Sequence, residues 1–340
     1  MRKLVLNKSK APEYGAKIIN QRKPTCGLHE VIVKVSAVGL NPIDTKIAKG
    51  ELALLLPFST NKPNIGFEFS GVIQEIGAGV SHYKAGDKIF GRLPLHKGGA
   101  FVEYLVADEK WISKAPNNID LKEAASIPQV GLTVIQGIER YTRLKTAKKV
   151  LIIGASGGAG SFAIQYCKNV LELHVSAICH SSAKEYVKYL GVDEIYYYDQ
   201  GKSPKGSGYD IIIDCVGGKQ TFKGIAKLNK RGAMISLAGP PVPSMIHGLN
   251  INWIRKLMLC PIFILNSIPP YVFSFIKSGR YIRFLTSNHP TQLQSLAELV
   301  EQNKIHTTVS EEFSLADFKA AFKRFNDSRV LGKVIIKVNE

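Results

Sequence analysis

The chain of 340 residues has few cysteines, and they are scattered. The five residues form no C-x-x-C pair: Cys26, Cys167, Cys179, Cys215 and Cys260. This spacing argues against a disulfide scaffold and a zinc ribbon, and it favours a reducing compartment. The eight histidines also lack the spacing of metal ligands. No metal site is therefore expected from the sequence.

No signal peptide is expected at the N-terminus either. The segment MRKLVLNKSKAPEYG has early basic residues but neither a long apolar core nor a small-residue cleavage site. A cytoplasmic protein is the expectation, with peripheral contact to a membrane as an alternative.

One apolar run, residues 257–276, has about the length of a membrane span. Three prolines and Asn266 interrupt it, and irregular backbone exposed to lipid is not tolerated. The run therefore predicts a last buried strand, a turn at 267–270 and an apolar helix. We expect this segment to form a substrate-side wall or a subunit contact.

Acidic residues are outnumbered in this chain. There are 27 Asp and Glu against 45 Lys and Arg, and the formal net charge is +18. Such a charge attracts anions, among them phosphorylated cofactors, acidic lipids and nucleic acids. Because the cations are spread from Arg2 to Lys337 without a tract, the pattern favours a basic solvated surface. An anionic-membrane surface is the next interpretation, and nucleic acid binding is the least favoured.

The length of the chain predicts two domains. In the first hundred residues, short β-branched runs separated by Gly and Pro are typical of an antiparallel or barrel-like β domain. The strands expected there are 31–38, 69–76, 87–90 and 100–106. A short helix at 121–126 follows, with Asp120 as its N-cap.

From Lys149 onward the chain alternates apolar strands with helices, which predicts a parallel, doubly wound sheet. The expected strands are 150–153, 175–179, 210–214 and 233–237, and the expected helices are 160–168 and 183–190. Helices at 293–303 and 316–325 come next. A final strand at 334–338 is expected to return to the β domain.

The strongest local signal is VLIIGASGGAG at residues 150–160, where a buried strand runs through a glycine-rich turn into a helix. Glycines let the backbone approach a pyrophosphate closely, and the helix N-terminus offers unpaired N–H groups and a positive dipole end. Placed between strand and helix in a βα series, the motif predicts a dinucleotide site. A tight structural turn is the alternative.

No carboxylate directly follows the next strand. Folds that bind NAD usually place Asp or Glu there, to accept a hydrogen bond from the ribose 2′-hydroxyl. This chain instead has His180, Ser181, Ser182 and then Lys184. Hydroxyls and a cation suit a 2′-phosphate, so NADPH is preferred over NADH. The same residues also occur as ordinary helix caps, and that interpretation stays open.

Taken in order, a series of short motifs resembles the zinc-independent quinone oxidoreductase branch (zeta-crystallin-like) of the medium-chain dehydrogenase/reductase superfamily, over essentially the whole chain. The motifs are VGLNPID (38–44), GFEFSGV (66–72), GDKIFG (86–91), GGAFVEY (98–104), AASIP (124–128), GLT (131–133), the 154–160 turn, DCVGG (214–218) and LGK (331–333). YDIIID (209–214) and the apolar stretch after Trp253 are similar to chloroplast-envelope quinone oxidoreductase homologues and to mitochondrial reticulon-interacting oxidoreductases.

The resemblance implies an α/β protein with two domains and an active site in the cleft between them. Residues 1–117 and 266–340 would form a GroES-like, β-rich catalytic domain, and residues 118–265 a Rossmann domain with a doubly wound parallel sheet. The implied cofactor-binding residues are Gly157, Gly158, Ala159 and Gly160 at the pyrophosphate; Ser181, Ser182, Lys184 and Tyr198 at the 2′-phosphate and ribose; Val216, Leu237, Ala238 and Gly239 at the nicotinamide; and Thr133 and Lys333. A homodimer is also implied.

The zinc enzymes of that superfamily use a Cys within the stretch GLNPID (39–44) and a His where Phe67 stands here. At least two of the roughly three ligands that a catalytic zinc needs are therefore missing. Without a Lewis acid an alcohol is hard to oxidise, whereas a quinone or an enone stabilises its own developing negative charge and needs mainly orientation. The sequence predicts an NADPH-dependent, zinc-free reductase that transfers hydride to a quinone or to the double bond of an α,β-unsaturated carbonyl.

Two residues are implied at the reacting groups. Asn41 would lie beside the nicotinamide and the substrate. Lys46 stands where several relatives carry a Tyr, a candidate donor to the substrate carbonyl; Lys46 either takes that role as a cation or points to solvent. The alternative function is a non-catalytic NADPH-binding protein that associates with anionic membrane or RNA, and a zinc-free alcohol dehydrogenase is a third.

Overall fold

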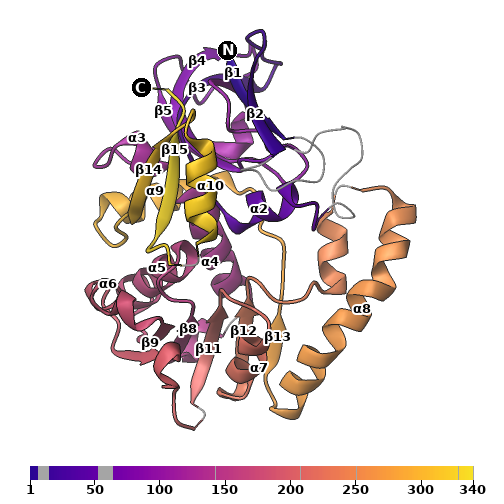
Figure 1. Cartoon of the computed structure of the whole chain (residues 1–340), viewed down its shortest axis with the longest axis vertical. Coiled ribbons are helices and arrows are strands. Elements are labelled where there is room, and N and C mark those ends of the chain that lie inside the picture. The colour runs from indigo at the N-terminus through magenta and orange to yellow at the C-terminus, as the bar shows by residue number, and fades with distance from the viewer. Residues whose placement is uncertain are drawn as a thin grey trace. The chain divides into compact units, whose positions relative to one another are not determined.

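The β-branched runs of the sequence form two separate large sheets in the computed structural model, which describes residues 1–6, 15–52, 64–141, 143–206, 208–249, 251–327 and 329–339. Contacts divide the chain into two units, each with its own sheet (Figure 1). Unit 1 consists of Met1–Leu132 and Ser287–Glu340, and unit 2 of Thr133–Thr286. Each unit is described separately below.

Unit 1 is built around a seven-stranded sheet with the order β14-β15-β3-β4-β5-β7, in which β6 also pairs with β3. The strands are β3 (Glu30–Gly39), β4 (Glu68–Ile76), β5 (Lys88–Arg92), β6 (Tyr104–Asp108), β7 (Ile112–Lys114), β14 (Val309–Ser314) and β15 (Lys333–Lys337), beside a two-stranded sheet of β1 (Arg2–Leu6) and β2 (Ala16–Asn20). Strand β15 pairs with β3, so the expected return of the chain end to the β domain is confirmed.

Aromatic side chains fill the core of unit 1, where Phe67, Phe69, Phe90, Phe101 and Phe322 are fully buried. Burying such large apolar side chains is a main source of folding free energy. The helices of unit 1 are α2 (Pro42–Ala48), α3 (Leu121–Ala124), α9 (Pro290–Glu301) and α10 (Phe318–Asn326). A capping box at Asp120 and Glu123 starts α3,, and Asp120 is the N-cap that the sequence predicted.

Unit 2 contains a six-stranded sheet with the order β10-β9-β8-β11-β12-β13, and all its strand pairs are parallel. Its strands are β8 (Lys149–Ile153), β9 (His174–Cys179), β10 (Glu194–Tyr197), β11 (Tyr209–Asp214), β12 (Leu228–Ser236) and β13 (Arg280–Ile282). Its helices are α5 (Gly158–Gln165), α6 (Lys184–Tyr189), α7 (Lys219–Ile225) and α8 (Trp253–Ile276). The predicted doubly wound parallel sheet is therefore confirmed.

The border between the units falls inside helix α4 (Pro128–Tyr141). Gly131 packs against Leu296 of α9, whereas Gly137 packs against Ile235 and Phe284 of unit 2. The second border lies after Thr286, because β13 pairs with β12 and α8 contacts both α7 and β13. The borders drawn from the sequence, after residues 117 and 265, lie earlier along the chain.

The prediction for residues 257–276 was wrong: they belong to one 24-residue helix, α8, in place of a strand, a turn and a shorter helix. Pro261, Pro269 and Pro270 lie inside this helix. Asn266 and Ser267 donate hydrogen bonds to the carbonyl oxygens of Ile262 and Ile264, so the polar side chains that suggested a turn are satisfied by the helix's own backbone. A proline removes one N–H donor without removing the apolar side chains around it.

By length and composition α8 is the one helix in the described ranges that would be able to cross a bilayer, with 28% of its most apolar window buried.

Candidate functional site

The order of the strands in unit 2 points to one edge of its sheet. From β8 the chain moves outward to β9 and β10, and then returns to the other side of β8 with β11, β12 and β13. In open parallel sheets ligands bind beyond the carboxyl ends of the strands, where the order reverses. For this sheet the reversal lies between β8 and β11, and the glycine-rich turn directly follows β8.

The turn has the backbone geometry of a phosphate cradle. Gly154 has a φ of +79°, and a Cβ on Gly160 would lie 2.3 Å from the carbonyl oxygen of Gly154, so glycine is required at both positions,. A Cβ on Gly157 would meet only that same oxygen, at 3.8 Å, and otherwise open space. Helix α5 begins at Gly158, and its first turn leaves backbone N–H groups without helical partners,.

The loops after β11 and β12 meet the glycine turn. The side chain of Val216 lies so close to Gly154 that a Cβ there would be 2.7 Å from it, and a Cβ on Gly217 would lie 2.6 Å from the carbonyl oxygen of Ala238. Three of the predicted cofactor segments, at 154–160, at Val216 and at 237–239, are thus brought together at the carboxyl edge of the sheet.

Asp214 fixes the geometry of these two loops. Its buried carboxylate accepts hydrogen bonds from the backbone N–H groups of Val216 and Gly217 at 3.0 and 2.8 Å. It also accepts from the hydroxyls of Thr221 at 2.7 Å and Ser236 at 3.1 Å. Four donors satisfy a carboxylate that is fully removed from water, so this residue positions the loops and is not free to react.

Arg283 holds the second loop from the other side, with its guanidinium donating to the carbonyl oxygens of Ser236 and Gly239. Thr133, another predicted cofactor contact, lies on α4 with its hydroxyl 2.8 Å from that of Thr286.

At the end of β9, Ser181 is paired with a carboxylate that sequence reasoning missed. Asp199 accepts hydrogen bonds from the Ser181 N–H at 2.9 Å and from the Ser181 hydroxyl at 2.6 Å. The hydrogen bond from the Ser181 hydroxyl lowers the pKa of Asp199 below its usual range, so this group is ionised at neutral pH. Asp199 follows β10, eighteen residues after Ser181, which is why a search directly after β9 finds no acid.

The remaining residues predicted at the ribose surround this pair. Nδ1 of His180 lies 2.9 Å from the Ser182 hydroxyl, and its ring contacts Tyr198 with 5.7 Å between centroids. Lys184 opens α6, and its ammonium lies 3.8 Å from Glu185 with both side chains exposed. The predicted group of Ser181, Ser182, Lys184 and Tyr198 therefore lies around the ends of β9 and β10, and Asp199 adds a negative charge to it.

Unit 1 contains a buried polar network around Lys333. Its ammonium donates to the carbonyl oxygen of Leu40 at 2.7 Å, to Oδ1 of Asn41 at 2.8 Å and to Oε1 of Glu68 at 2.5 Å. Asn41 in turn donates its amide to the same carboxylate oxygen at 2.7 Å, and the N–H of Gln129 donates to Oε2. The side chains of Lys333 and Glu68 are 5% and 0% exposed, so the ion pair between them is buried. Two predicted site residues, Asn41 and Lys333, are therefore in direct contact inside unit 1.

A second carboxylate, Asp44, extends this network. It accepts hydrogen bonds from the N–H groups of Asn41 at 2.8 Å and Gly66 at 2.6 Å. Complete burial raises the pKa of Asp44 from 3.8 to about 7,.

Arg92 lies directly opposite Glu68 in the register of β4 and β5. Burial lowers its pKa to about 10, against the opposing field of Glu68. Its guanidinium donates to Gln129 at 2.7 Å and to Asn288. The network around Glu68 therefore contains two buried cations.

Lys46, the candidate donor, lies on the last turn of α2, and its side chain is half-buried. Asn41 is the N-cap of the same helix, so the two candidate residues of the substrate side come from one short element.

The residue that the resemblance places at one zinc-ligand position does not fit a zinc ion. Phe67, at the position where zinc enzymes carry His, is an apolar core residue with 1% exposure. Within the part of the chain that the structure describes, no group of three His, Cys, Asp or Glu residues is arranged to hold a metal.

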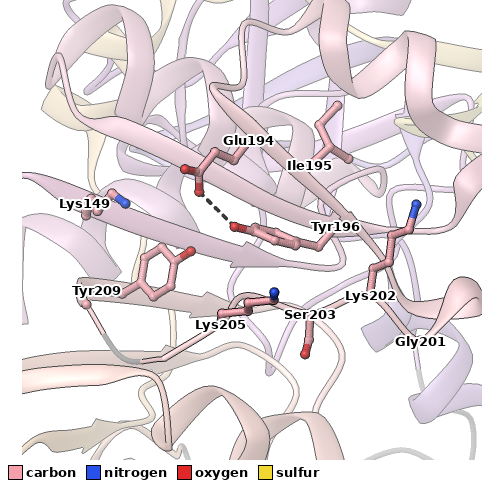
Figure 2. Close-up of a pocket in the computed structure, with 10 residues that line it drawn as sticks. Lys149, Glu194, Ile195, Tyr196, Gly201, Lys202, Ser203, Lys205 and Tyr209 are labelled. Atoms are coloured by element: carbon pink, nitrogen blue, oxygen red, sulfur yellow. Dashed lines mark hydrogen bonds between the residues drawn. The ribbon is translucent and has the colours of Figure 1, made fainter.

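A hollow of about 790 Å³ lies elsewhere in unit 2, beside the first residues of β8, β10 and β11. Figure 2 shows its lining, with Lys149, Lys202 and Lys205 around Tyr196, whose hydroxyl donates to Glu194 at 3.1 Å. Because the strands are parallel, their first residues lie at the opposite edge from the glycine turn. This hollow contains none of the predicted site residues.

Comparison with known proteins agrees with this geometry. A family model described as "Alcohol dehydrogenase GroES-like domain" matches residues 27–117, and one described as "Zinc-binding dehydrogenase" matches residues 190–336. The chloroplast envelope quinone oxidoreductase homolog of Arabidopsis thaliana is 31% identical over 326 residues, which is 92% of this chain and 91% of that protein. The chain belongs to the quinone oxidoreductase branch of the medium-chain dehydrogenase/reductase superfamily.

Other members of the superfamily support the assignment. The mitochondrial NAD(P)H oxidoreductase RTN4IP1 of Bos taurus is 30% identical over 331 residues, covering 91% of this chain and 82% of that protein. Two solved structures share the fold over nearly their full lengths. The quinone oxidoreductase from Coxiella burnetii has a TM-score of 0.83 at 24% identity, covering 100% of this chain and 99% of its own. The Escherichia coli quinone oxidoreductase complexed with NADPH has a TM-score of 0.80 at 19% identity, covering 99% and 100%.

Within this branch of the superfamily, the glycine turn and the GroES-like domain had clear signals in the sequence. Glu68 had a weaker signal, an acidic residue inside an apolar strand motif, GFEFSGV. Asp199 had none, since only the pairing of β9 with β10 brings it to Ser181.

Proposed function

We propose that this protein is an NADPH-dependent, zinc-free reductase that delivers hydride to a quinone or to the double bond of an α,β-unsaturated carbonyl. The observation that carries the proposal is the glycine turn at the reversal point of the parallel sheet, where a Cβ at Gly160 would collide with the turn itself. Membership of the quinone oxidoreductase branch supports the choice of acceptor.

The residues at this edge suit a dinucleotide. The N–H groups of Gly158, Ala159 and Gly160 at the start of α5 would bind the pyrophosphate, with Gly157 leaving room for it,. The loops at Val216 and at 237–239, held by Asp214 and Arg283, would position the nicotinamide. When bound, the cofactor would supply a hydride from C4 of its nicotinamide ring.

The preference for NADPH rests on opposing charges. Ser182 and Lys184 offer a donor and a cation to a 2′-phosphate. Asp199 opposes such a phosphate by like-charge repulsion and occupies the Ser181 hydroxyl,. We propose that the cation dominates, because Lys184 forms among the described residues a single long ion pair of 3.8 Å, with the exposed Glu185, while Asp199 is already bound to Ser181.

The residue at the predicted zinc-ligand position favours an acceptor that is already activated, such as a quinone or an enone. The resemblance places Phe67, an apolar core residue, where zinc enzymes carry a His ligand, and we propose that no zinc ion polarises an alcohol in this protein. A quinone or an enone takes up negative charge on its own oxygen, and the protein needs to supply orientation and one or two donors.

On the substrate side we propose two roles. Asn41 would orient the acceptor, since Asp44, Glu68 and Lys333 fix its backbone and its amide. Lys46 would donate to the acceptor carbonyl. A Lys46→Met variant should then lose kcat by about tenfold or more with little change in cofactor affinity, while Lys46→Tyr should retain activity. Equal kcat in wild type and Lys46→Met would exclude Lys46 as the donor to the acceptor carbonyl.

The deciding experiment is NADPH consumption at 340 nm by the purified protein against a panel of quinones and α,β-unsaturated aldehydes and ketones. NADH is measured in parallel, and added zinc and a chelator are controls. Fast turnover that neither addition changes would support the proposal. Binding of NADPH without turnover of any acceptor would overturn it and leave a binding protein.

A further inference from the structure

Helix α8 exposes an unusual amount of apolar surface. Twelve of its large apolar side chains are 40–83% exposed, among them Trp253, Leu257, Leu265 and Phe275. Soluble monomers rarely expose contiguous apolar patches of more than a few hundred Å², and larger ones mark interaction sites. The patch covers most of the helix, so it needs an occupant.

The buried side chains of α8 lie on one face of the helix. The buried residues Leu259, Phe263, Ser267, Pro270 and Ser274 follow each other at intervals of three or four, as one helical face does,. Figure 1 shows α8 in orange beside α7 and β13, and it contacts both of them and the 3₁₀ helix η7 (Pro243–Gly248). Phe273 of α8 packs on Phe222 of α7 with 6.0 Å between ring centroids. The other faces of the helix are apolar as well, and their large side chains are exposed in the part of the chain that the structure describes.

The sequence on both sides of this helix carries charge of a single sign. From Cys215 to Ala297 the sequence contains ten Lys and Arg and no Asp or Glu. From Leu257 to Ile276 there is no charged residue at all. An apolar surface framed by cations alone fits an anionic, apolar occupant.

Cations gather at the C-terminal end of α8. The N–H of Arg231 donates to the carbonyl oxygen of Ser278 at 2.6 Å, and Arg280 pairs in register with Ala233 of β12. Together with Lys230 and Lys277, these exposed residues form a basic cluster directly beside Phe275 and Ile276. At the other end, Trp253 is followed by Arg255 and Lys256.

We infer that α8 docks the protein on an anionic lipid surface, lying in the plane of the bilayer with its exposed apolar faces among the acyl chains and its flanking cations at the headgroups. Amphipathic segments with basic flanks and an exposed Trp bind membranes in this way.

Two other arrangements fit less well. A span across the bilayer would carry the two ends of α8 to opposite sides, yet the helix connects β12 with β13, which pair side by side in one sheet. A span would also remove the buried face of α8, which begins at Leu259, from its contacts with the rest of unit 2. A second copy on the same face would bring two clusters of like charge together, each on a chain of net charge +18,.

The test is flotation of the purified full-length protein with vesicles of phosphatidylcholine, with or without about one third phosphatidylglycerol. We expect binding to the anionic vesicles that falls steeply in about 0.5 M NaCl, because salt screens exposed charges. The variant Leu265→Glu/Phe275→Glu should lose at least tenfold in partitioning. The matched control is Leu28→Glu/Tyr189→Glu, two exposed apolar residues elsewhere with 61% and 75% exposure, which should float as wild type does.

The cations are tested in the same assay. Lys230→Gln/Lys277→Gln should weaken binding several-fold, whereas Lys319→Gln/Lys323→Gln on α10 removes the same charge and should leave it unchanged. The chain has two tryptophans, so a Trp111→Phe variant makes Trp253 the sole reporter. Its emission should shift to shorter wavelength when anionic vesicles are added.

Three results would overturn the inference: no flotation at low salt, equal flotation of the Leu265→Glu/Phe275→Glu variant, or an unmoved Trp253 emission. If that variant instead changes the size of the particle in solution while wild type ignores vesicles, the face belongs to a second copy. Release from vesicles only by detergent would indicate a span. Thermal unfolding of each variant shows whether the fold is intact.

Discussion

Asp199 and Ser181 are joined by two hydrogen bonds, one of 2.6 Å from the hydroxyl and one of 2.9 Å from the backbone N–H of the serine. This pair puts a negative charge beside the predicted 2′-phosphate position, where Lys184 supplies a positive one. The choice between NADPH and NADH therefore depends on two residues of opposite effect, and each is open to a separate test.

The first prediction concerns that choice. Asp199→Asn should lower the Kd for NADPH about tenfold, the change that about 1.4 kcal/mol produces, because it removes the like charge. Lys184→Ala should raise it by a similar factor, and neither change should alter the Kd for NADH as much. Titration of both cofactors by calorimetry measures this. Asp193→Asn, a charge removed elsewhere in unit 2, is the control, and an unchanged NADPH-to-NADH ratio in both variants would refute the assignment.

The second prediction separates the fold of the glycine turn from its use. Gly157→Ala places a Cβ in open space, 3.8 Å from its nearest neighbour, so stability should stay within about 0.5 kcal/mol while cofactor affinity falls at least tenfold. Gly160→Ala forces a Cβ to 2.3 Å from the Gly154 oxygen, so the protein itself should be destabilised by about 1–3 kcal/mol. Thermal unfolding and cofactor titration are measured on both. Unimpaired binding by Gly157→Ala would argue against a pyrophosphate at this turn.

The third prediction concerns the buried ion pair of unit 1. Lys333→Met leaves Glu68 charged and without its ammonium partner, which should cost about 3–5 kcal/mol in the free energy of unfolding. The double variant Glu68→Gln/Lys333→Met should cost less than the sum of the single changes, as contacting residues couple. The exposed pair of Lys23 and Glu75 is the control, since Lys23→Met should cost no more than about 1 kcal/mol. Denaturant unfolding supplies the values, and additivity would exclude a direct interaction.

The fourth prediction is a pH dependence. Burial raises the pKa of Asp44 from 3.8 in the unfolded chain to about 7 in the folded protein. The folded state therefore holds a proton that the unfolded chain releases, and the stability that this contributes is full below about pH 4 and lost as pH rises through about 7. Unfolding free energies of wild type and Asp44→Asn, measured between these limits, should converge or cross in favour of the variant as pH rises. In the control variant, Glu185→Gln at an exposed position, the difference in unfolding free energy from wild type should stay constant over the same pH range.

The sequence predicted the strands of the parallel sheet well, because continuous apolar runs such as 150–153 leave little freedom in a βα series. The glycine turn was equally clear, since its spacing reflects a steric requirement at Gly154 and Gly160. Contacts between residues that are far apart in the sequence were harder to predict. Asp199 reaches Ser181 only through strand pairing, and Glu68, Asn41 and Lys333 meet across 265 to 292 residues of sequence.

Helix α8 shows another limit of sequence reasoning. Prolines are strong signals against a helix in isolation, but the cost of each lost hydrogen bond competes with the burial of side chains such as Leu259 and Phe263,. Local propensity alone does not include that packing. The exposure of the remaining apolar faces also depends on which elements surround the helix, and a hydrophobic run carries no information about this.

The place of β15 has a consequence for synthesis. Residues Lys333–Lys337 form an interior strand of the unit 1 sheet, between β14 and β3, while the other sheet is complete once Ile282 has been added. On the ribosome, where domains fold as units and in order, unit 2 can fold while Ala37–Gly39 of β3, the part that pairs with β15 and not with β6, still lacks its partner. The sheet of unit 1 is therefore incomplete until residues 333–337 have been added, and an unpaired strand edge is exposed to other chains during that interval,.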